Sequence, residues 1–256
     1  MSASASINAA AWSGGRYLGA YSSADLRPVE AQLLDALGDD LSGRVLELGC
    51  GAGRVTGHLA ARARELLAMD ISQRMLDRCA RNVPGVRYHH GDIAHLSTFA
   101  EPPFDAVVAT FNVVDVLDDA ERRALLDEVR RVLVPGGVLV FSSHNRGIAP
   151  QIKAPWQLPT HRLLALGNAV VRLPLRMRNR HRLRRHEVHD PGYLIVNDSA
   201  HDYGLLHYYV SPSAQRAQLA QHGFDLLECL TLDGRRVDSD RDADDCPELH
   251  YVARSH

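Results

Sequence analysis

The chain has 256 residues, enough to bury a sizeable core, and it fits one α/β domain with an insertion better than two domains. Hydrophobic residues make up 45% and charged residues 23%, a composition typical of globular proteins that argues against disorder. The formal net charge of −2 gives no reason to expect nucleic acid or a membrane as a partner. Residues 148–210 depart from this balance, because they hold nine Lys or Arg against four Asp or Glu.

Targeting signals and cysteine usage favour a cytoplasmic protein. The first residues, Met-Ser-Ala-Ser-Ala-Ser, have neither the charged nor the apolar region of a signal peptide. The longest apolar stretch, residues 163–171, is too short to span a bilayer. The four cysteines form no CxxC pair, so we expect reduced thiols; they are Cys50, Cys79, Cys229 and Cys246.

Residues 1–42 are expected to form an N-terminal cap segment. Residues 1–11 are small and polar, which predicts a frayed end. Residues 12–21 are aromatic and rich in glycine, and a helix over about residues 24–37 follows, closed by Gly38.

Strands and helices alternate regularly from Arg44 onward. This order is typical of βαβ units, and it predicts a parallel sheet covered by helices on both faces. Apolar runs predict the strands at residues 44–48, 66–70, 86–89, 104–110 and 138–142.

The clearest helix covers residues 118–133. Asp118 is expected to cap it, with Glu121 at the third helical position, as in a capping box. Pro135-Gly136-Gly137 is expected to end it and to turn the chain into the next strand. Its apolar stripe consists of Leu125, Leu126, Val129, Val132 and Leu133.

The regular pattern breaks after Asn145. Residues 148–210 are expected to be an irregular inserted lid that binds the substrate, between a core made of residues 43–147 and 211–256. The alternative for its polar and aromatic part, residues 197–209, is a β-hairpin or an extra strand that extends the sheet. After the insertion the regular pattern resumes. A helix is expected to begin at Ser211-Pro212 and to end at Gly223, and strands are expected at residues 225–232 and 248–254.

A glycine-rich turn follows the first strand, at residues 49–53. Three glycines on alternate positions let the backbone turn sharply and leave no side chain where a ligand must approach. Asp70 ends the second strand, where a carboxylate can accept hydrogen bonds from both hydroxyls of a ribose. Asp92 ends the third strand and can take the exocyclic amine of an adenine. The apolar residues expected to sandwich that ring are Ile71, Met75 and Ile93.

Five segments together resemble the successive motifs of class I methyltransferases. They are Glu-Leu-Gly-Cys-Gly-Ala-Gly at residues 47–53, Met-Asp-Ile-Ser at 69–72, Gly-Asp-Ile at 91–93, Phe-Asp-Ala-Val-Val at 104–108 and Leu-Val-Pro-Gly-Gly at 133–137. The resemblance covers roughly residues 43–143. It implies a Rossmann-like sheet of seven strands, with the last strand antiparallel, and S-adenosylmethionine as the cofactor, with S-adenosylhomocysteine as its product.

The resemblance also implies roles for single residues around that cofactor. Asp70 would hold the ribose and Asp92 would face the adenine. Thr110 and Phe111 would lie near the reactive sulfonium, and Tyr17 or Tyr21 would close over the cofactor. The methionyl part would be cradled by Glu47, Gly49, Gly51 and Gly53.

Two other classes of protein have to be weighed against a methyltransferase. A nicotinamide-dependent oxidoreductase also uses a Gly-rich turn and a distal acid, but its fingerprint is G-x-G-x-x-G, whereas this chain has G-x-G-x-G. A non-catalytic binding module that kept the fold would have no need of Asp70 and Asp92. A thermal-shift comparison of S-adenosylhomocysteine, NAD and NADP separates the three.

The acceptor is expected to be a small molecule methylated on oxygen or nitrogen. The segment after the fourth strand, Phe111-Asn112-Val113-Val114, lacks the Asn/Asp-Pro-Pro-aromatic turn of enzymes that methylate base amines. Ribose-methylating enzymes of this fold use two lysines, and Lys153 is the only lysine here. A peptide or other acidic acceptor, bound through the Arg-rich run at residues 176–185, is the alternative; a solvated helix or loop is the more usual meaning of such a run.

Two histidines are the candidate catalytic residues. His144 follows the fifth strand at the mouth of the expected site and is a candidate general base, although a solvent-facing histidine is an equal alternative. His207 belongs to the polar and aromatic part of the lid. The residues expected to contact the acceptor are Asn112, His144, Tyr203, His207 and Tyr208. No metal site is expected, because no Cys or carboxylate completes a familiar ligand set with His181, His186 and His189.

Overall fold

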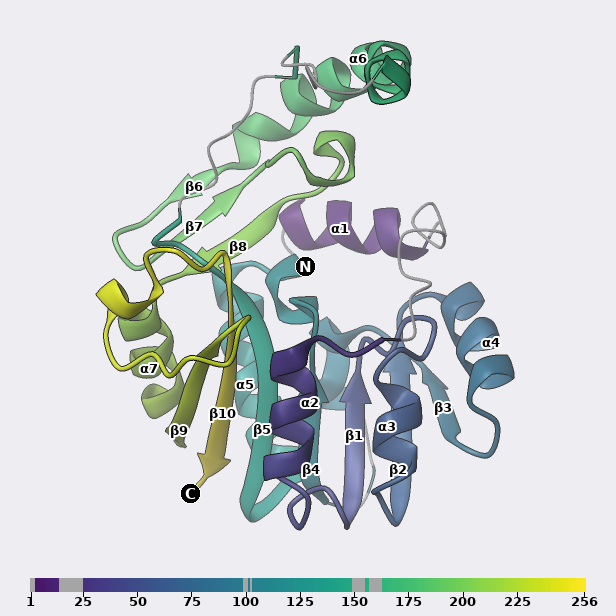
Figure 1. The fold of residues 1–256 in the computed structure, drawn as a ribbon, viewed down its shortest axis with the longest axis vertical. Coiled ribbons are helices and arrows are strands. Elements are labelled where there is room, and N and C mark those ends of the chain that lie inside the picture. Colours follow the sequence, from purple (N-terminus) through teal and green to yellow (C-terminus); the bar gives the residue numbers. More distant parts are fainter. Residues whose placement is uncertain (1–2, 14–24, 99–100, 102, 149–154, 157–162) are drawn as a thin grey trace.

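The computed structural model describes residues 3–13, 25–98, 101, 103–148, 155–156 and 163–256, and its centre is one mixed sheet (Figure 1). The strand order is β3-β2-β1-β4-β5-β8-β7-β6, and β10 lies between β5 and β9. Most of the sheet is the core that the sequence predicts, and the remainder comes from the insertion.

Seven strands form the core sheet, in the order β3-β2-β1-β4-β5-β10-β9. Strands β1 to β5 are parallel, whereas β10 is antiparallel to both of its neighbours. The predicted fold class, a seven-stranded Rossmann-like sheet with an antiparallel last strand, is confirmed. The bounds are β1 Arg44–Leu48, β2 Glu65–Asp70, β3 Arg87–His90, β4 Phe104–Ala109, β5 Leu133–Asn145, β9 Phe224–Thr231 and β10 Glu248–Ser255.

Helices cover both faces of this sheet, because the core strands are apolar on both sides (Figure 1). One buried cluster joins α2 (Pro28–Ala36) and α3 (Thr56–Ala60) to the first face. A second cluster joins α5 (Asp119–Val132), α7 (Pro212–Gln221) and the 3-10 helix η1 (Ile93–Thr98) to the other face. Helix α4 (Gln73–Asn82) packs beside β2 and β3.

Helix α5 begins as the sequence predicts. The side chain of Asp118 accepts a hydrogen bond from the Glu121 amide (2.8 Å), and Glu121 accepts one in return from the Asp118 amide. We expected the chain to turn at residues 135–137 and then to enter the next strand, and this expectation is wrong. Strand β5 already starts at Leu133, which pairs with Phe104, and the Pro-Gly-Gly segment is an irregularity within that strand.

Strand β5 runs past the end of β4, and its extra residues pair with two further strands at the carboxyl end of the sheet. His144 pairs with Glu248 of β10 on one side and with Tyr209 of β8 on the other. Strand β8 therefore occupies the place beside β5 that β4 leaves vacant beyond Ala109.

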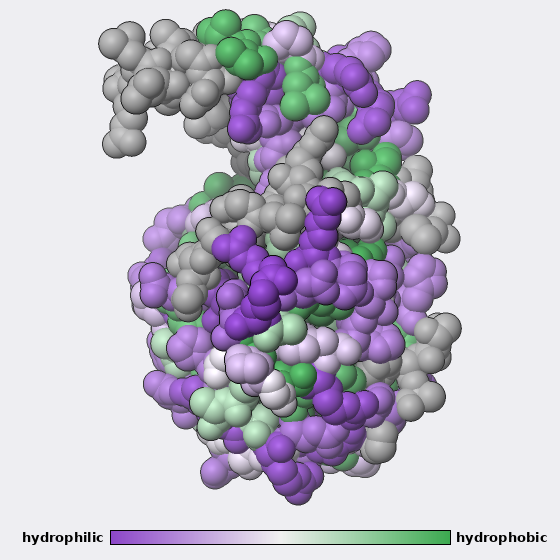
Figure 2. Space-filling view, turned by 90° about the vertical axis from the view of Figure 1, so that its right-hand side faces the viewer, coloured by the Kyte–Doolittle hydropathy of each residue, from purple (hydrophilic) through white to green (hydrophobic). Residues whose placement is uncertain are grey.

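The insertion is more regular than the sequence pattern predicts. Its aromatic end is an added strand that extends the sheet, which was the alternative to a lid, and the Arg-rich run lies in α6 and the 3-10 turn after it. Figure 2 shows this part as a smaller mass above the core. Its elements are α6 Leu163–Leu183, η3 Arg184–His186, β6 Val188–His189, β7 Tyr193–Val196, η4 Ala200–Tyr203 and β8 His207–Val210.

The expectation of a frayed N-terminal end is wrong for residues 3–11, which belong to helix α1 (Ala3–Ser13). Figure 1 shows this helix between the insertion and the upper edge of the core sheet. Its buried Asn8 donates hydrogen bonds to the carbonyls of Val116 and Leu206 (2.7 Å each) and accepts one from the Leu206 amide (3.1 Å). One side chain therefore ties α1 to both the core and the insertion.

The described helices and cysteines bear on two further expectations. No helix in the described ranges has the length and apolar character that crossing a bilayer requires. All four cysteines are free and buried, in agreement with the expected reduced thiols.

The cap of α5 gives a test of the fold energetics. Asp118→Ala removes the acceptor for the Glu121 amide, and we expect a loss of about 1 kcal/mol in the free energy of unfolding. Asp118→Asn keeps a side-chain oxygen at the cap and should retain most of the stability. Urea denaturation followed by circular dichroism measures both; equal losses in the two variants would show that the cap contributes little.

Candidate active site

One cavity of about 430 Å³ lies at the carboxyl ends of the core strands. In open α/β sheets this is the edge where ligands bind. Its walls come from the glycine loop, from the ends of β2, β3 and β4, from β5 and from the insertion. Nearly all of the predicted cofactor residues line it, namely Glu47, Gly49, Gly51, Asp70, Ile71, Met75, Asp92, Ile93, Thr110 and Phe111.

Gly51 is the point where the loop backbone is open to the cavity. Its φ of +55° is a conformation that favours glycine, and a Cβ added here would meet no atom within 4 Å. Its amide donates a hydrogen bond to Asp70 Oδ2 (2.8 Å). Gly53, in contrast, faces α4: a Cβ there would lie 2.9 Å from the sulfur of Cys79, and Gly53 does not line the cavity. The expected cofactor contact of Gly53 is therefore corrected to a packing role.

The two strand-end acids are fixed by backbone amides. Asp70 accepts from Gly51 and from Ser72 (2.8 Å each), and Asp92 Oδ1 accepts from Ala94 (3.0 Å). Burial raises the pKa of Asp70, although these hydrogen bonds act against it. Each carboxylate oxygen can accept a second hydrogen bond, so both acids fit the ribose and adenine roles that the family resemblance implies.

Glu47 is a buried carboxyl group with an unused oxygen. Burial raises its pKa to about 8, against a hydrogen bond with Thr56 that lowers it. Its Oε2 has no hydrogen-bond partner in the described structure. A buried polar atom without a partner is costly, so this oxygen fits a ligand that brings a hydrogen-bond donor, as the ammonium of a methionyl group does.

The chain leaves β4 in a conformation that few residues adopt. Phe111 and Asn112 have φ values of +61° and +57°, and both line the cavity. Two guanidinium groups hold the Phe111 ring, with Arg27 at 4.4 Å and Arg54 at 4.9 Å from its centroid. Strained backbone of this kind is often found at binding sites, where the surrounding contacts maintain it.

His144 is oriented by a buried carboxylate. Its Nδ1 lies 2.7 Å from Asp115 Oδ2, in a contact whose angle departs from a good hydrogen bond, and its backbone amide donates to the same oxygen (2.7 Å). Its Nε2 lies 3.2 Å from the amide nitrogen of Asn112. Burial acts to lower the pKa of His144, but the Asp115 carboxylate outweighs it, and the net effect is a raised pKa.

His207 has its own carboxylate in the insertion. Its Nδ1 lies 2.8 Å from Asp198 Oδ2, which also accepts from the Tyr209 hydroxyl (2.7 Å). Burial acts to raise the pKa of Asp198, but His207 and Tyr209 hold it below its usual range. Asp198 therefore stays ionised, and it directs the Nδ1–H of His207 toward itself.

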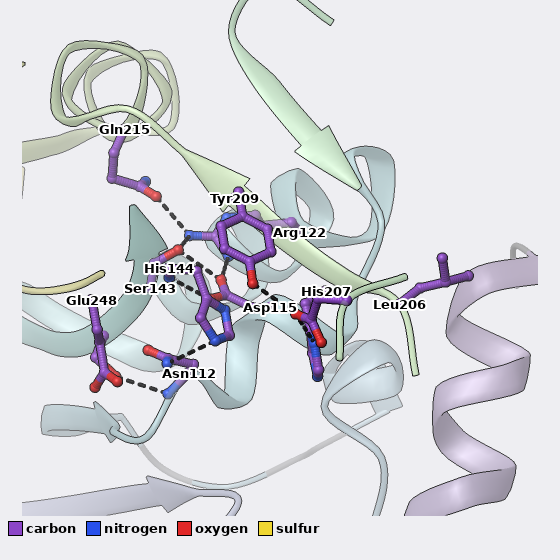
Figure 3. A network of polar contacts seen from close by, with 12 residues as sticks. Asn112, Asp115, Arg122, Ser143, His144, Leu206, His207, Tyr209, Gln215 and Glu248 are labelled. Carbon is purple, nitrogen blue, oxygen red and sulfur yellow. Dashed lines mark hydrogen bonds and ion pairs between the residues drawn. The ribbon is translucent and has the colours of Figure 1, made fainter. Parts of the chain in front are cut away.

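The two histidine–aspartate pairs lie side by side, and both histidines line the same end of the cavity (Figure 3). The ring centroids of His144 and His207 are 5.3 Å apart, and the Tyr209 ring lies 4.8 Å from that of His144. His201 lies next to His207, at 6.2 Å, and burial together with His207 lowers its pKa to about 4. This end of the cavity can take and return a proton.

Three of the five residues expected to contact the acceptor line the cavity, namely Asn112, His144 and His207. Tyr203 and Tyr208 do not, and this corrects the expectation. Tyr208 points to the opposite face of β8 from His207, where it stacks on Tyr193 (5.0 Å) and donates to Asp119 (2.6 Å). Tyr203 is fully buried beside Arg176, whose guanidinium lies 5.4 Å from its ring. Tyr17 and Tyr21 lie outside the described residues.

Several cavity residues were not expected from the sequence. Ala9 and Trp12 come from α1, and the small, polar residues of this segment do not predict that it lines a cavity. Asp115 contacts His144, 29 residues away in the sequence, and Asp198 contacts His207, 9 residues away. These pairs form only in the folded chain, so the sequence pattern does not predict them. The Arg-rich run is partly structural, since Arg180 pairs with Glu187 and donates to the Asn197 carbonyl (2.9 Å).

Known proteins support the family that these motifs indicate. Residues 45–137 match the family model described as a methyltransferase domain. The chain is similar to the biotin biosynthesis bifunctional protein BioHC of Cellvibrio japonicus, at 36% identity over 51% of this chain and 26% of that protein. It is also similar to a trans-aconitate 2-methyltransferase of Methylobacterium nodulans, at 34% identity over 60% and 54% of the two chains. A malonyl-[acyl-carrier protein] O-methyltransferase of Yersinia pestis is 30% identical over 53% and 50%.

Solved structures share the fold over nearly the whole chain. An S-adenosylmethionine-dependent methyltransferase from Clostridium acetobutylicum superposes with a TM-score of 0.59 at 13% identity, over 94% of this chain and 96% of that one. An amino pentose methyltransferase from Micromonospora echinaspora, bound to S-adenosylmethionine, gives 0.54 at 21% identity over 95% and 96%.

Residues 45–137 thus carry a methyltransferase domain, and the chain has the fold of solved S-adenosylmethionine-dependent methyltransferases, as its motifs indicate. The expected methyltransferase domain is confirmed by the family match, a solved neighbour of the same fold holds S-adenosylmethionine, and the comparisons give the oxidoreductase alternative no support. In sequence, the chain spans only about half or less of the length of these three curated relatives, between 26% and 54%.

Gly51 tests the cofactor end of the cavity. We expect Gly51→Val to abolish binding of S-adenosylhomocysteine, because the new side chain enters the cavity rather than the core. Gly85→Val is the matched control: Gly85 also has a positive φ (+86°) and open space around a Cβ, but it lies outside the cavity. Calorimetry on both variants decides this; normal binding by Gly51→Val would mean that the loop is only a structural turn.

Glu47 links pH to stability. Its folded pKa of about 8 lies above the unfolded value of 4.5, so stability is lost as the pH rises from 4.5 to 8. Relative to Glu47→Gln, which cannot ionise, wild type should lose up to about 1.4 kcal/mol per pH unit in this window. Urea denaturation from pH 5 to 8 measures the difference, and parallel curves would show that Glu47 is not the group responsible. The same variant should bind S-adenosylhomocysteine more weakly.

Proposed function

We propose that this protein transfers a methyl group from S-adenosylmethionine to an oxygen or nitrogen atom of a small molecule. The observation that carries the proposal is that a single cavity joins the cofactor-type residues to the His207–Asp198 pair. Trans-aconitate 2-methyltransferase is an example of a relative that acts on a small molecule.

The residues at one end of the cavity fit the cofactor. Asp70 would accept the ribose hydroxyls, Asp92 the adenine amine, and the unused oxygen of Glu47 the methionyl ammonium. Gly51 leaves room for close approach of the ligand to the backbone. When bound, S-adenosylmethionine supplies an already activated methyl group, so the protein contributes mainly orientation and proton transfer.

His207 is the general base in this proposal. Because Asp198 accepts the Nδ1–H, the Nε2 lone pair is the one left to take a proton from the acceptor. The insertion supplies this residue, and it covers the acceptor end of the cavity with His201 and Ala200. Residues 148–210 thus act as the substrate-binding lid while their last strand extends the core sheet.

Binding measurements test the cofactor part of the proposal. We expect S-adenosylmethionine and S-adenosylhomocysteine to bind in calorimetry, with no binding of NAD or NADP. Release of S-adenosylhomocysteine in the presence of hydroxyl- and amine-containing small molecules tests the transfer itself. Binding of NAD in preference to both methionine-derived ligands would refute the proposal.

His207→Ala tests the base. Loss of a positioned general base should reduce turnover by about 10²- to 10⁴-fold, while the affinity for S-adenosylhomocysteine stays nearly unchanged. Tyr208→Phe is the control, since Tyr208 is adjacent in the chain but points away from the cavity, toward Asp119. A loss of cofactor affinity equal to the loss of turnover would place His207 in the cofactor site instead.

A further inference from the structure

Asn112 presents an unused hydrogen-bond acceptor at the acceptor end of the cavity. Its backbone is fixed in the left-handed region (φ +57°), and its amide N–H donates to Ser142 Oγ (2.8 Å). Its side-chain oxygen Oδ1 is buried and has no hydrogen-bond partner among the described residues. The side chain lines the cavity, and a buried acceptor without a partner is costly, so this oxygen fits a ligand that brings a hydrogen-bond donor.

A chain of buried polar contacts sets the orientation of that amide (Figure 3). Arg122 and Ser143 both donate to Asp115 Oδ1, at 2.6 and 2.7 Å. Asp115 Oδ2 lies 2.7 Å from Nδ1 of His144, so a proton on Nδ1 faces that carboxylate and, in the neutral form of the ring, the Nε2 lone pair faces Asn112. The amide nitrogen of Asn112 is the donor that can satisfy this lone pair, and the oxygen is therefore the atom left for the ligand.

The cationic side chains that line the cavity are already paired within the protein. In the described part of the chain, Arg27 pairs with Glu248 and Arg54 pairs with Glu30. The two histidines have their own carboxylates, Asp115 and Asp198, and the lowered pKa of His201 keeps that ring neutral near pH 7. A carboxylate on the acceptor would therefore find its cationic neighbours already neutralised, and burying it here is costly.

We infer that the acceptor is a neutral molecule with two adjacent hydroxyl or amino groups, one methylated next to His207 and the other donating a hydrogen bond to Asn112 Oδ1. This inference rests on the proposed function and names its substrate class. The two contact points are neighbours, because the His144 ring lies 5.3 Å from that of His207 and 3.2 Å separates His144 from Asn112.

The chemical step balances for a hydroxyl acceptor. His207 Nε2 takes the hydroxyl proton, and the acceptor oxygen forms a bond to the methyl carbon. The carbon–sulfur bond of the donor breaks, and its electron pair stays on sulfur to give the neutral thioether. The second hydroxyl loses no proton, since Asn112 can accept a hydrogen bond but cannot act as a base.

Matched probe compounds test the inference. Catechol carries adjacent hydroxyls, resorcinol separates them, phenol has one, and benzoate carries a carboxylate instead. We expect catechol to give the highest kcat/KM in S-adenosylhomocysteine release, about tenfold above phenol and resorcinol, and to raise the melting temperature of the S-adenosylhomocysteine complex most. Benzoate should do neither.

Variants at Asn112 connect that preference to the amide. Asn112→Ala should reduce the catechol kcat/KM about tenfold, and it should reduce the value for phenol much less, so that the ratio of catechol to phenol falls toward one. Asn112→Asp keeps an acceptor oxygen and should retain part of the preference. The pH profile of the remaining activity should stay that of wild type, because the base is His207.

The outcomes separate this inference from the function on which it rests. Equal values for catechol and phenol, a preference for benzoate, or a catechol preference that survives in Asn112→Ala would each overturn it. If S-adenosylhomocysteine binds but none of the probes is turned over or stabilises the complex, the inference fails and the proposed function stands. If S-adenosylhomocysteine does not bind wild type, the proposed function fails as well.

Discussion

The ion pair of Asp115 and Arg122 is the contact on which the upper part of this structure depends. Both side chains are buried, and Arg122 also donates to Ser143 (3.1 Å) and to Gln215 (2.6 Å). The pair therefore joins the 3-10 helix η2 (Val113–Val116), α5, β5 and α7. Burying two charges costs desolvation energy, and here several hydrogen bonds to the same groups offset that cost.

That pair connects the stability of the fold to the geometry of the site. Asp115 lies in the turn that follows Phe111 and Asn112, and it receives the backbone amide of His144. The left-handed exit from β4, the orientation of His144 and the position of the cavity wall are therefore maintained together. A strand of ordinary length would end before His144; the extension of β5 beyond β4 is what brings this histidine between Glu248 and Tyr209.

The cavity residues at the ends of the core strands could be predicted from the sequence almost completely. Its residues stand at the ends of successive parallel strands, so local patterns and βαβ order are enough to bring Glu47, Gly51, Asp70 and Asp92 to one edge. Gly53 was misassigned because the motif does not show which glycine faces a ligand and which faces a neighbouring helix. That difference depends on the packing of Cys79 in α4.

The acceptor half could be predicted only in part. His144 and His207 were identified as polar residues in suitable segments, but their carboxylate partners are set by tertiary structure. Tyr208 was misassigned because the aromatic run was expected to be a lid, and a strand sends alternate side chains to opposite faces. The role of α1 could not be predicted, since its small residues carry little amphipathic pattern and its order depends on contacts with distant parts of the chain.

The three hydrogen bonds of Asn8 affect how easily the insertion can separate from the core. Since they hold α1 to the core at Val116 and to the insertion at Leu206, any opening between these two parts must break at least one side of the attachment. Each such bond contributes about 0.5–1.5 kcal/mol, so the closed arrangement is favoured without being locked. Helix α1 thus joins the core to the insertion, and the energy needed to separate these two parts depends on a side chain that lies far from both in the sequence.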